Sequence, residues 1–315
     1  MIHAARARVR LEPALRGAAR LEWVREITAY LGRYVDLPLV SFPSIVVPPD
    51  PAALATEQIE DLATEVRRAW RLGDGPISNA TWLLENHGAI MTRAELGTPT
   101  LDGFSCWSPD DRTPYVFLGS DKESAVRSRL DAAHELGHLI LHRAVAKSGM
   151  RRPANHRLYE SQAYRFGAAF LLPARSFAEE LYVPTIEALR GLKSRWLVSI
   201  GMMLHRSADL GLVTKDQAQR MWISYTRRGW RKGEPLDDSI PVEEPRVLKR
   251  AFQILIEQAV RTGPKIVADL QIPGEDIEEL AGLPSGFLSE RSPDIRLHEP
   301  SGAPNKIMTF PCRPG

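Results

Sequence analysis

The strongest constraint on the fold is one apolar helix that carries ionisable groups. The run His134-Glu135-Leu136-Gly137-His138 lies inside a segment that reads as a continuous helix, with Leu130, Ala133, Ile140 and Leu141 around it. A helix that is apolar on most sides is buried, and buried imidazole and carboxylate groups are costly unless something pairs them. The alternative is a surface helix with two solvated histidines, which the apolar neighbours disfavour. The sequence therefore predicts a central, buried helix whose polar groups share a partner.

A metal ion is the partner that this spacing favours. His134 and His138 are four residues apart, so on a helix they share one face and lie about 6 Å apart along its axis. Two imidazoles at that spacing can bind one zinc ion. Glu135 lies one position round the helix, where it can take a proton from a water activated by the metal. The pattern predicts the chemistry of a zinc metallopeptidase.

A catalytic zinc needs a third protein ligand, and two residues are candidates. His142 continues the histidine row, but it lies about 12 Å from His134 along the axis, too far to converge on one ion. It suits a helix C-terminus or a role in supporting a ligand. Glu160 is the better candidate, because Ala163 and Gly167 on its face let a second helix, predicted over 159–172, approach closely. The alternative for Glu160 is a charge placed favourably near a helix N-terminus.

Other polar residues near the motif have open roles. Asp131 lies three residues before His134, where it can accept the outer N–H of a ligand histidine or pair with Arg127 on the helix surface. Transition-state stabilisation needs a donor beside the metal, for which Tyr159, Tyr164 and His156 are candidates. Tyr164 is preferred because it lies four residues after Glu160, although a tyrosine on a helix is more often structural.

Two longer runs carry a resemblance to a known family. The run from Arg127 to His142 and the run from Glu160 to Pro173 resemble the two core motifs of the ImmA/IrrE family of metallo-endopeptidases. Softer similarity extends the resemblance over about residues 20–285. It implies a zinc peptidase with Glu160 as the third ligand, and a helix-turn-helix repressor as the substrate. Tyr164 and Gly167 depart from the family pattern, which often has Asn and Ala there.

The remaining sequence predicts an α+β protein with a minimal zincin-like domain and a mostly helical C-terminal region. Helices are expected over 14–35, 51–72 and 78–86, strands over 89–92, 101–107 and 114–118, and further helices over 186–192, 200–210 and 215–225. The strand at Pro114–Leu118 is expected to be the edge that pairs with an extended peptide. The expected parts are an N-terminal helix with a proline-rich strap (1–50), the metallopeptidase domain (51–178), a helical region (179–290) and a loosely ordered tail (291–315).

Composition narrows the partners. The chain has 315 residues and a formal charge of +2, so bulk charge gives no argument for binding nucleic acid or membranes. Two cysteines do not form a disulfide framework, which favours a reducing, cytoplasmic setting. A basic cluster at Arg227, Arg228, Arg231 and Lys232 can contact phosphates, or can be a solvated loop, which is preferred. The alternative function is a protease-like regulator that binds a repressor or DNA without turnover.

Overall fold

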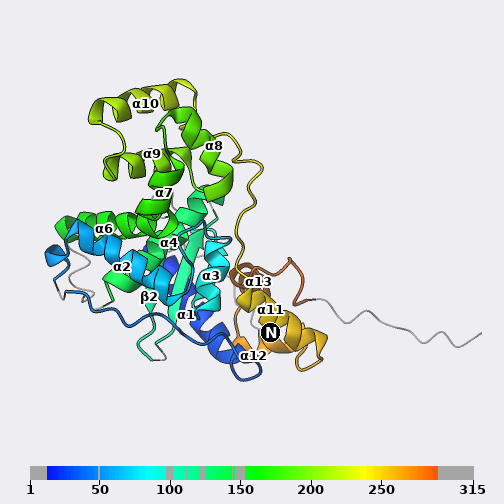
Figure 1. Ribbon diagram of the computed structural model, residues 1–315. Helices are drawn as coiled ribbons and strands as arrows, with labels where there is room; N and C mark the ends of the chain where they lie inside the picture. Colours follow the sequence, from blue (N-terminus) through cyan, green and yellow to red (C-terminus); the bar gives the residue numbers. More distant parts are fainter. Residues whose placement is uncertain are drawn as a thin grey trace, which may run out of the picture.

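The computed structural model describes residues 13–48, 50–96, 102–110, 112–120, 125–143, 145 and 153–289. The protein has the predicted α+β fold, with a small mixed sheet followed by a helical C-terminal region (Figure 1). The predicted tail at 291–315 lies outside the described residues. Among the residues that are described, no helix is both long and apolar enough to cross a membrane.

The sheet has three strands in the order β1-β3-β2: β1 is Ile90–Ala94, β2 is Gly103–Trp107 and β3 is Pro114–Gly119. β3 pairs parallel with β1 and antiparallel with β2. The prediction that Pro114–Leu118 forms the peptide-binding edge is therefore wrong, because this strand is central and its residues are buried. The edge beside the metal motif is β2, whose residues are only partly buried.

One face of the sheet shares a core with four helices, of which the last two carry the motif residues. These are α2 (Thr56–Ala69), α3 (Ala80–Asn86), α4 (Ala125–Leu141) and α6 (Pro153–Leu171). Met91, Val116 and Leu118 point from the strands into this core, where they join Leu136 and Phe166. The predicted helix over 51–72 is interrupted, because Asp50 caps a short 3-10 turn, η1 (Pro51–Ala53), ahead of α2.

Helices from both ends of the chain cover the other face. Ile90, Tyr115 and Phe117 pack there in a second core. Its helices are α1 (Pro13–Leu31), α11 (Val247–Glu257), α12 (Gly263–Leu270) and α13 (Gly274–Ala281). Figure 1 shows these helices grouped together, with α1 in blue beside α11–α13 in yellow and orange. β1 and β3 are thus buried on both faces of the sheet, whereas β2 is partly exposed.

The remaining helices gather at the opposite end of the molecule (Figure 1). They are α7 (Ala174–Glu180), α8 (Ile186–Trp196), α9 (Ile200–Asp209) and α10 (Lys215–Arg227). Ser199 caps α9 by accepting from the N–H of Met202, and Thr214 and Gln217 form a capping box at the start of α10. The domain boundaries at 50, 178 and 290 stay a prediction.

Candidate metal centre and catalytic cleft

The close approach of α4 and α6 builds the site. A Cβ added to Gly137 on α4 would lie 2.9 Å from the carbonyl oxygen of Ala163, and one added to Gly167 on α6 would lie 3.1 Å from the backbone of Ala133 and His134. The expectation that small residues bring these helices together is confirmed. α6 begins at Pro153, a favoured first residue of a helix, so Glu160 lies two turns into the helix. The alternative that Glu160 is only an N-terminal charge is therefore wrong.

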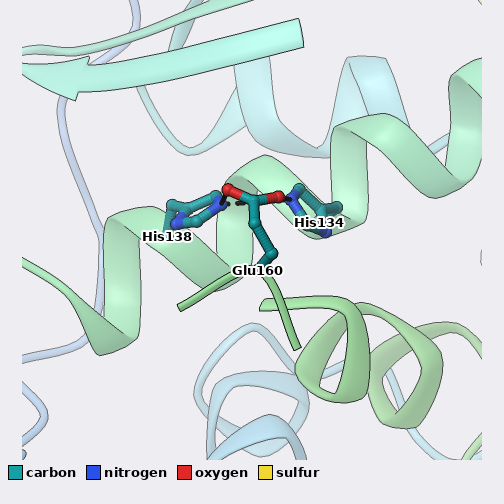
Figure 2. Close-up of side chains that lie close together, drawn as sticks. All are labelled: His134, His138 and Glu160. Carbon is teal, nitrogen blue, oxygen red and sulfur yellow. Dashed lines mark hydrogen bonds and ion pairs between the residues drawn. The ribbon is translucent and has the colours of Figure 1, made fainter. Parts of the chain in front are cut away.

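Three side chains meet where the two helices cross. Nε2 of His134 lies 3.1 Å from Nε2 of His138 and 3.1 Å from Oε2 of Glu160. Nε2 of His138 lies 3.4 Å from the other carboxylate oxygen of Glu160. Figure 2 shows the carboxylate of Glu160 between the two imidazoles, which project from one helix.

These distances suit a metal ion. The three residues each offer one ligand atom, and these atoms all lie within 4.8 Å of one another. Zinc bonds of about 2.0–2.1 Å in a tetrahedron place ligand atoms roughly 3.3 Å apart, which is close to the separations observed. Two imidazoles and one carboxylate form a ligand set of catalytic zinc sites, which leave the fourth position open. The residues present fit Zn²⁺.

Glu135 lies beside the edge strand. Its carboxylate Oε1 would be 3.2 Å from a Cβ at Gly103, so the glycine gives the carboxylate its space. The Ser105 hydroxyl donates to the backbone carbonyl of Glu135, and the Trp107 indole N–H donates to that of Leu139. Alternate residues of β2 thus face α4 and hold it against the strand. Sequence reasoning missed Gly103 and Ser105, although the alternation Gly-x-Ser-x-Trp is a signal that they share a face.

The free edge of β2 can pair with another strand. The backbone N–H of Gly119 donates to Asp102, and that of Ser108 donates to Thr113. In an antiparallel pair the bonded positions alternate, so the peptide groups of Gly103, Ser105 and Trp107 point away from β3. Within the part of the chain that the structure describes, no further strand pairs with this side of β2, so these groups face the cleft where an added strand could pair with them.

The surroundings of the two carboxylates shift their pKa values in opposite directions. Hydrogen bonds from His134 and His138 hold the pKa of Glu160 far below its usual range. Burial raises the pKa of Glu135, despite the nearby histidines. Burial opposes the charged form of His134, but its hydrogen bond to Glu160 and the neighbouring carboxylates together raise its pKa. Glu160 is therefore the carboxylate suited to bind a cation, and Glu135 the one suited to accept a proton.

His142 contacts the far side of His138 and lies outside the cluster of His134, His138 and Glu160. Its Nδ1 lies 3.0 Å from Nδ1 of His138, and its Nε2 lies 3.0 Å from Oε1 of Gln162. The Gln162 amide also donates to the carbonyl of Pro51. The ring of Tyr159 packs on His142, with ring centres 4.9 Å apart. Burial lowers the pKa of His142 to about 4. The role of Gln162 was not predicted from the sequence, because no local pattern indicates it.

A cleft of about 690 Å³ opens over these residues. Its lining includes the predicted ligands, Glu135, the strand β2 and the other candidate donors, His156, Tyr159 and Tyr164. Burial and the charge of Asp209 raise the pKa of Tyr164, so its hydroxyl stays protonated at neutral pH. Asp131 also lines the cleft, and burial raises its pKa to about 7 against the opposing charges of Arg127 and His134.

The part of the chain that includes the site matches the model of a known protein family. A family model described as the IrrE N-terminal-like domain, Peptidase_M78, matches residues 84–208. This range includes the three strands and the helices α4, α6, α7 and α8. No curated protein shows significant sequence similarity to the chain. Among solved structures, a Mycobacterium tuberculosis transcriptional regulator is similar at 18% identity and a TM-score of 0.35. That similarity covers 48% of this chain and 46% of the other, so less than half of the regulator is matched. Residues 84–208 are therefore similar to the IrrE N-terminal-like domain family, Peptidase_M78.

Proposed function

We propose that the protein is a zinc-dependent endopeptidase. The observation that carries this proposal is the convergence of His134, His138 and Glu160 beside a buried Glu135 that lies against an edge strand. A site that only stored a metal would need the three ligands, but it would need neither the carboxylate of Glu135 nor the strand edge. The peptidase family matched by residues 84–208 supports the same conclusion.

The substrate binds as an added strand along β2. The outward N–H and C=O groups of Gly103, Ser105 and Trp107 pair with the peptide backbone. Antiparallel pairing is preferred because its hydrogen bonds are straight and slightly stronger. Backbone pairing positions the peptide, and the side chains that line the cleft select its sequence. This arrangement places a peptide bond next to Glu135, which lies against Gly103.

The protein's own groups supply the proton transfers. His134, His138 and Glu160 would hold a zinc ion, which would lower the pKa of a bound water and polarise the carbonyl of the scissile bond. Glu135 accepts the proton of the attacking water and then delivers it to the nitrogen of the departing amine, as the C–N bond breaks. The protonated hydroxyl of Tyr164 is a donor for the negative charge that develops on the carbonyl oxygen. Water and the peptide bond yield one carboxylate and one amine.

The proposed substrate is a helix-turn-helix repressor, whose cleavage relieves repression. The support is the resemblance of the HELGH and Glu160 motifs to the ImmA/IrrE peptidases. Cleavage of a regulator rather than of bulk protein suits the narrow requirement of strand pairing, since folded proteins present few free extended segments. Direct contact with nucleic acid through the basic cluster of Arg227, Arg228, Arg231 and Lys232 is not needed for this role.

A census of new protein N-termini tests the function and identifies the substrate. Cells express either the wild type or Glu135→Gln, with zinc supplied, under ordinary growth, DNA damage and oxidative stress. We expect one dominant new N-terminus inside a helix-turn-helix protein, present only with the wild type. Identical N-termini in both strains under all three conditions would contradict the proposal and favour a regulator that acts by binding alone.

A further inference from the structure

We propose that the Pro51 carbonyl, Gln162 and His142 form a positioning chain that fixes the proton of His138 on Nδ1 and so leaves Nε2 free for the metal. The inference rests on the metal-binding part of the proposed function, and not on peptide cleavage. It assigns roles to residues outside the three ligands.

The chain of hydrogen bonds begins at a carbonyl group, which can accept a hydrogen bond but cannot donate one. The carbonyl oxygen of Pro51 lies 2.7 Å from Nε2 of Gln162, so the amide nitrogen must be on that side and donate. The 3-10 turn holds this carbonyl in place, because Leu54 N–H also donates to it and Asp50 caps the turn. Gln162 therefore presents its carbonyl oxygen, Oε1, to His142. Gln162 is 4% exposed and Pro51 is buried, so the protein shields this contact from bulk solvent.

The orientation of the Gln162 amide fixes the direction of its hydrogen bond with His142. Gln162 Oε1 accepts, so Nε2 of His142 must carry a hydrogen. His142 is 1% exposed, and a charged imidazole at such a site is costly. A neutral ring with its hydrogen on Nε2 has a lone pair on Nδ1. Nδ1 of His142 is thus the acceptor for the remaining contact, the one with Nδ1 of His138 at 3.0 Å.

The last bond fixes the ligand. His138 must donate from Nδ1 to His142, so a neutral His138 has no hydrogen on Nε2, which lies 3.1 Å from Nε2 of His134. The alternative protonation of His142, on both nitrogens, would force His138 to accept at Nδ1. A neutral His138 would then carry its hydrogen on Nε2 and could not bind a metal. The fixed amide orientation of Gln162 therefore selects the tautomer that binds zinc, across α6 and α4.

Imidazole nitrogen NMR of the metal-free wild-type protein is the first test. We expect His138 to carry its hydrogen on Nδ1 and His142 to carry its hydrogen on Nε2. A His138 with its hydrogen on Nε2 would overturn the proposal. This measurement needs no substitution and no substrate, so its outcome is independent of whether the protein cleaves peptides.

Gln162→Leu is the second test, because it removes the anchor but neither histidine. We expect His138 and His142 to show mixed tautomers and the affinity for Zn²⁺ alone, measured by competition with a chelator, to fall by about 10- to 100-fold. The matched control is Thr92→Val, which removes a different buried hydrogen bond, from Thr92 to the Leu280 carbonyl. The control should lose stability but keep wild-type tautomers and zinc affinity. Wild-type tautomers and affinity in Gln162→Leu, or an equal loss of affinity in the control, would overturn the proposal.

Discussion

At the scale of single residues, the site assigns different tasks to two carboxylates. Glu160 is held ionised by two histidines, whereas burial raises the pKa of Glu135. We expect Glu135→Gln to keep zinc affinity and stoichiometry but to lose about 10²- to 10⁴-fold in cleavage rate, the usual contribution of a general acid–base group. The comparison is Glu160→Gln, which should lose zinc itself. Measuring bound zinc and peptide hydrolysis on both variants separates the two roles. A Glu135→Gln protein that retains full activity would remove the base from the mechanism.

The histidine–carboxylate contact also predicts how zinc binding depends on pH. The pKa of His134 is raised above its ordinary value, so in the metal-free protein its proton stabilises the fold below about pH 6.5, and this stabilisation is lost as pH rises through the raised pKa. Zinc must displace that proton, whereas Glu160 is already ionised. The increase in Tm given by a fixed zinc concentration should therefore grow from about pH 6 to about pH 8. Thermal unfolding with zinc and with chelator measures it; an increase that shrinks with pH would contradict this assignment.

At the scale of elements, the contact between α4 and α6 sets the metal geometry. A Cβ at Gly137 would overlap the Ala163 backbone, which cannot rotate away, so α6 and its Glu160 must move. We expect Gly137→Ala to cost about 1–3 kcal/mol in unfolding free energy and to weaken zinc binding by about 5- to 100-fold. Gly191→Ala on α8 is the control, because nothing lies within 4 Å of the new Cβ. It should gain up to about 1 kcal/mol from helix propensity. Urea unfolding and zinc titration distinguish them, and equal behaviour of the two variants would refute the packing argument.

The edge strand makes a separate prediction. The N–H of Ser105 points away from β3, whereas that of Phe104 belongs to the ladder with Phe117. Ser105→Pro should keep the fold and the zinc, and lose about 5- to 10-fold in kcat/KM with one substrate hydrogen bond. Ser105→Ala controls for the lost hydroxyl, and Phe104→Pro should instead destabilise the protein. A Ser105→Pro enzyme with unchanged kcat/KM would exclude strand pairing at this position.

Local patterns predicted the elements better than their arrangement. The spacing of His134 and His138, the small residues after Glu160 and the cap at Ser199 each depend on neighbours within one or two turns, and all were readable from the sequence. The central position of β3 depends on its parallel pairing with β1, a contact between distant segments. The unbroken apolar run Tyr115–Leu118 was nevertheless a signal for a central strand. Gln162 has no such signal, since its role exists only once the Pro51 carbonyl lies beside it.

At the scale of the whole molecule, the residues matched by the peptidase family do not enclose their own core. Residues 84–208 contain the sheet, but α1 and α11–α13, outside this range, bury one of its faces. The segment that precedes α11 is bonded to α3 and α4. Glu243 accepts from the N–H groups of Ala80 and Thr81 at the start of α3, and it pairs with Arg129 on α4. The C-terminal helices are therefore part of the scaffold that holds α4 in place.

This tie makes a quantitative prediction about stability. The side chain of Arg129 is 2% exposed and that of Glu243 is 10% exposed, so removing the carboxylate leaves a buried cation without its partner. We expect Glu243→Ala to cost about 3–5 kcal/mol in unfolding free energy. The adjacent Glu244 is 64% exposed and lies 3.9 Å from Arg93, so Glu244→Ala should cost less than about 1 kcal/mol. Urea unfolding measures both. Replacing the pair together, with Arg129→Leu and Glu243→Leu, should recover much of the loss, because a well-packed apolar pair needs no desolvated charge. If the double variant is no more stable than Glu243→Ala, the lost contacts with α3, rather than the stranded arginine, set the cost.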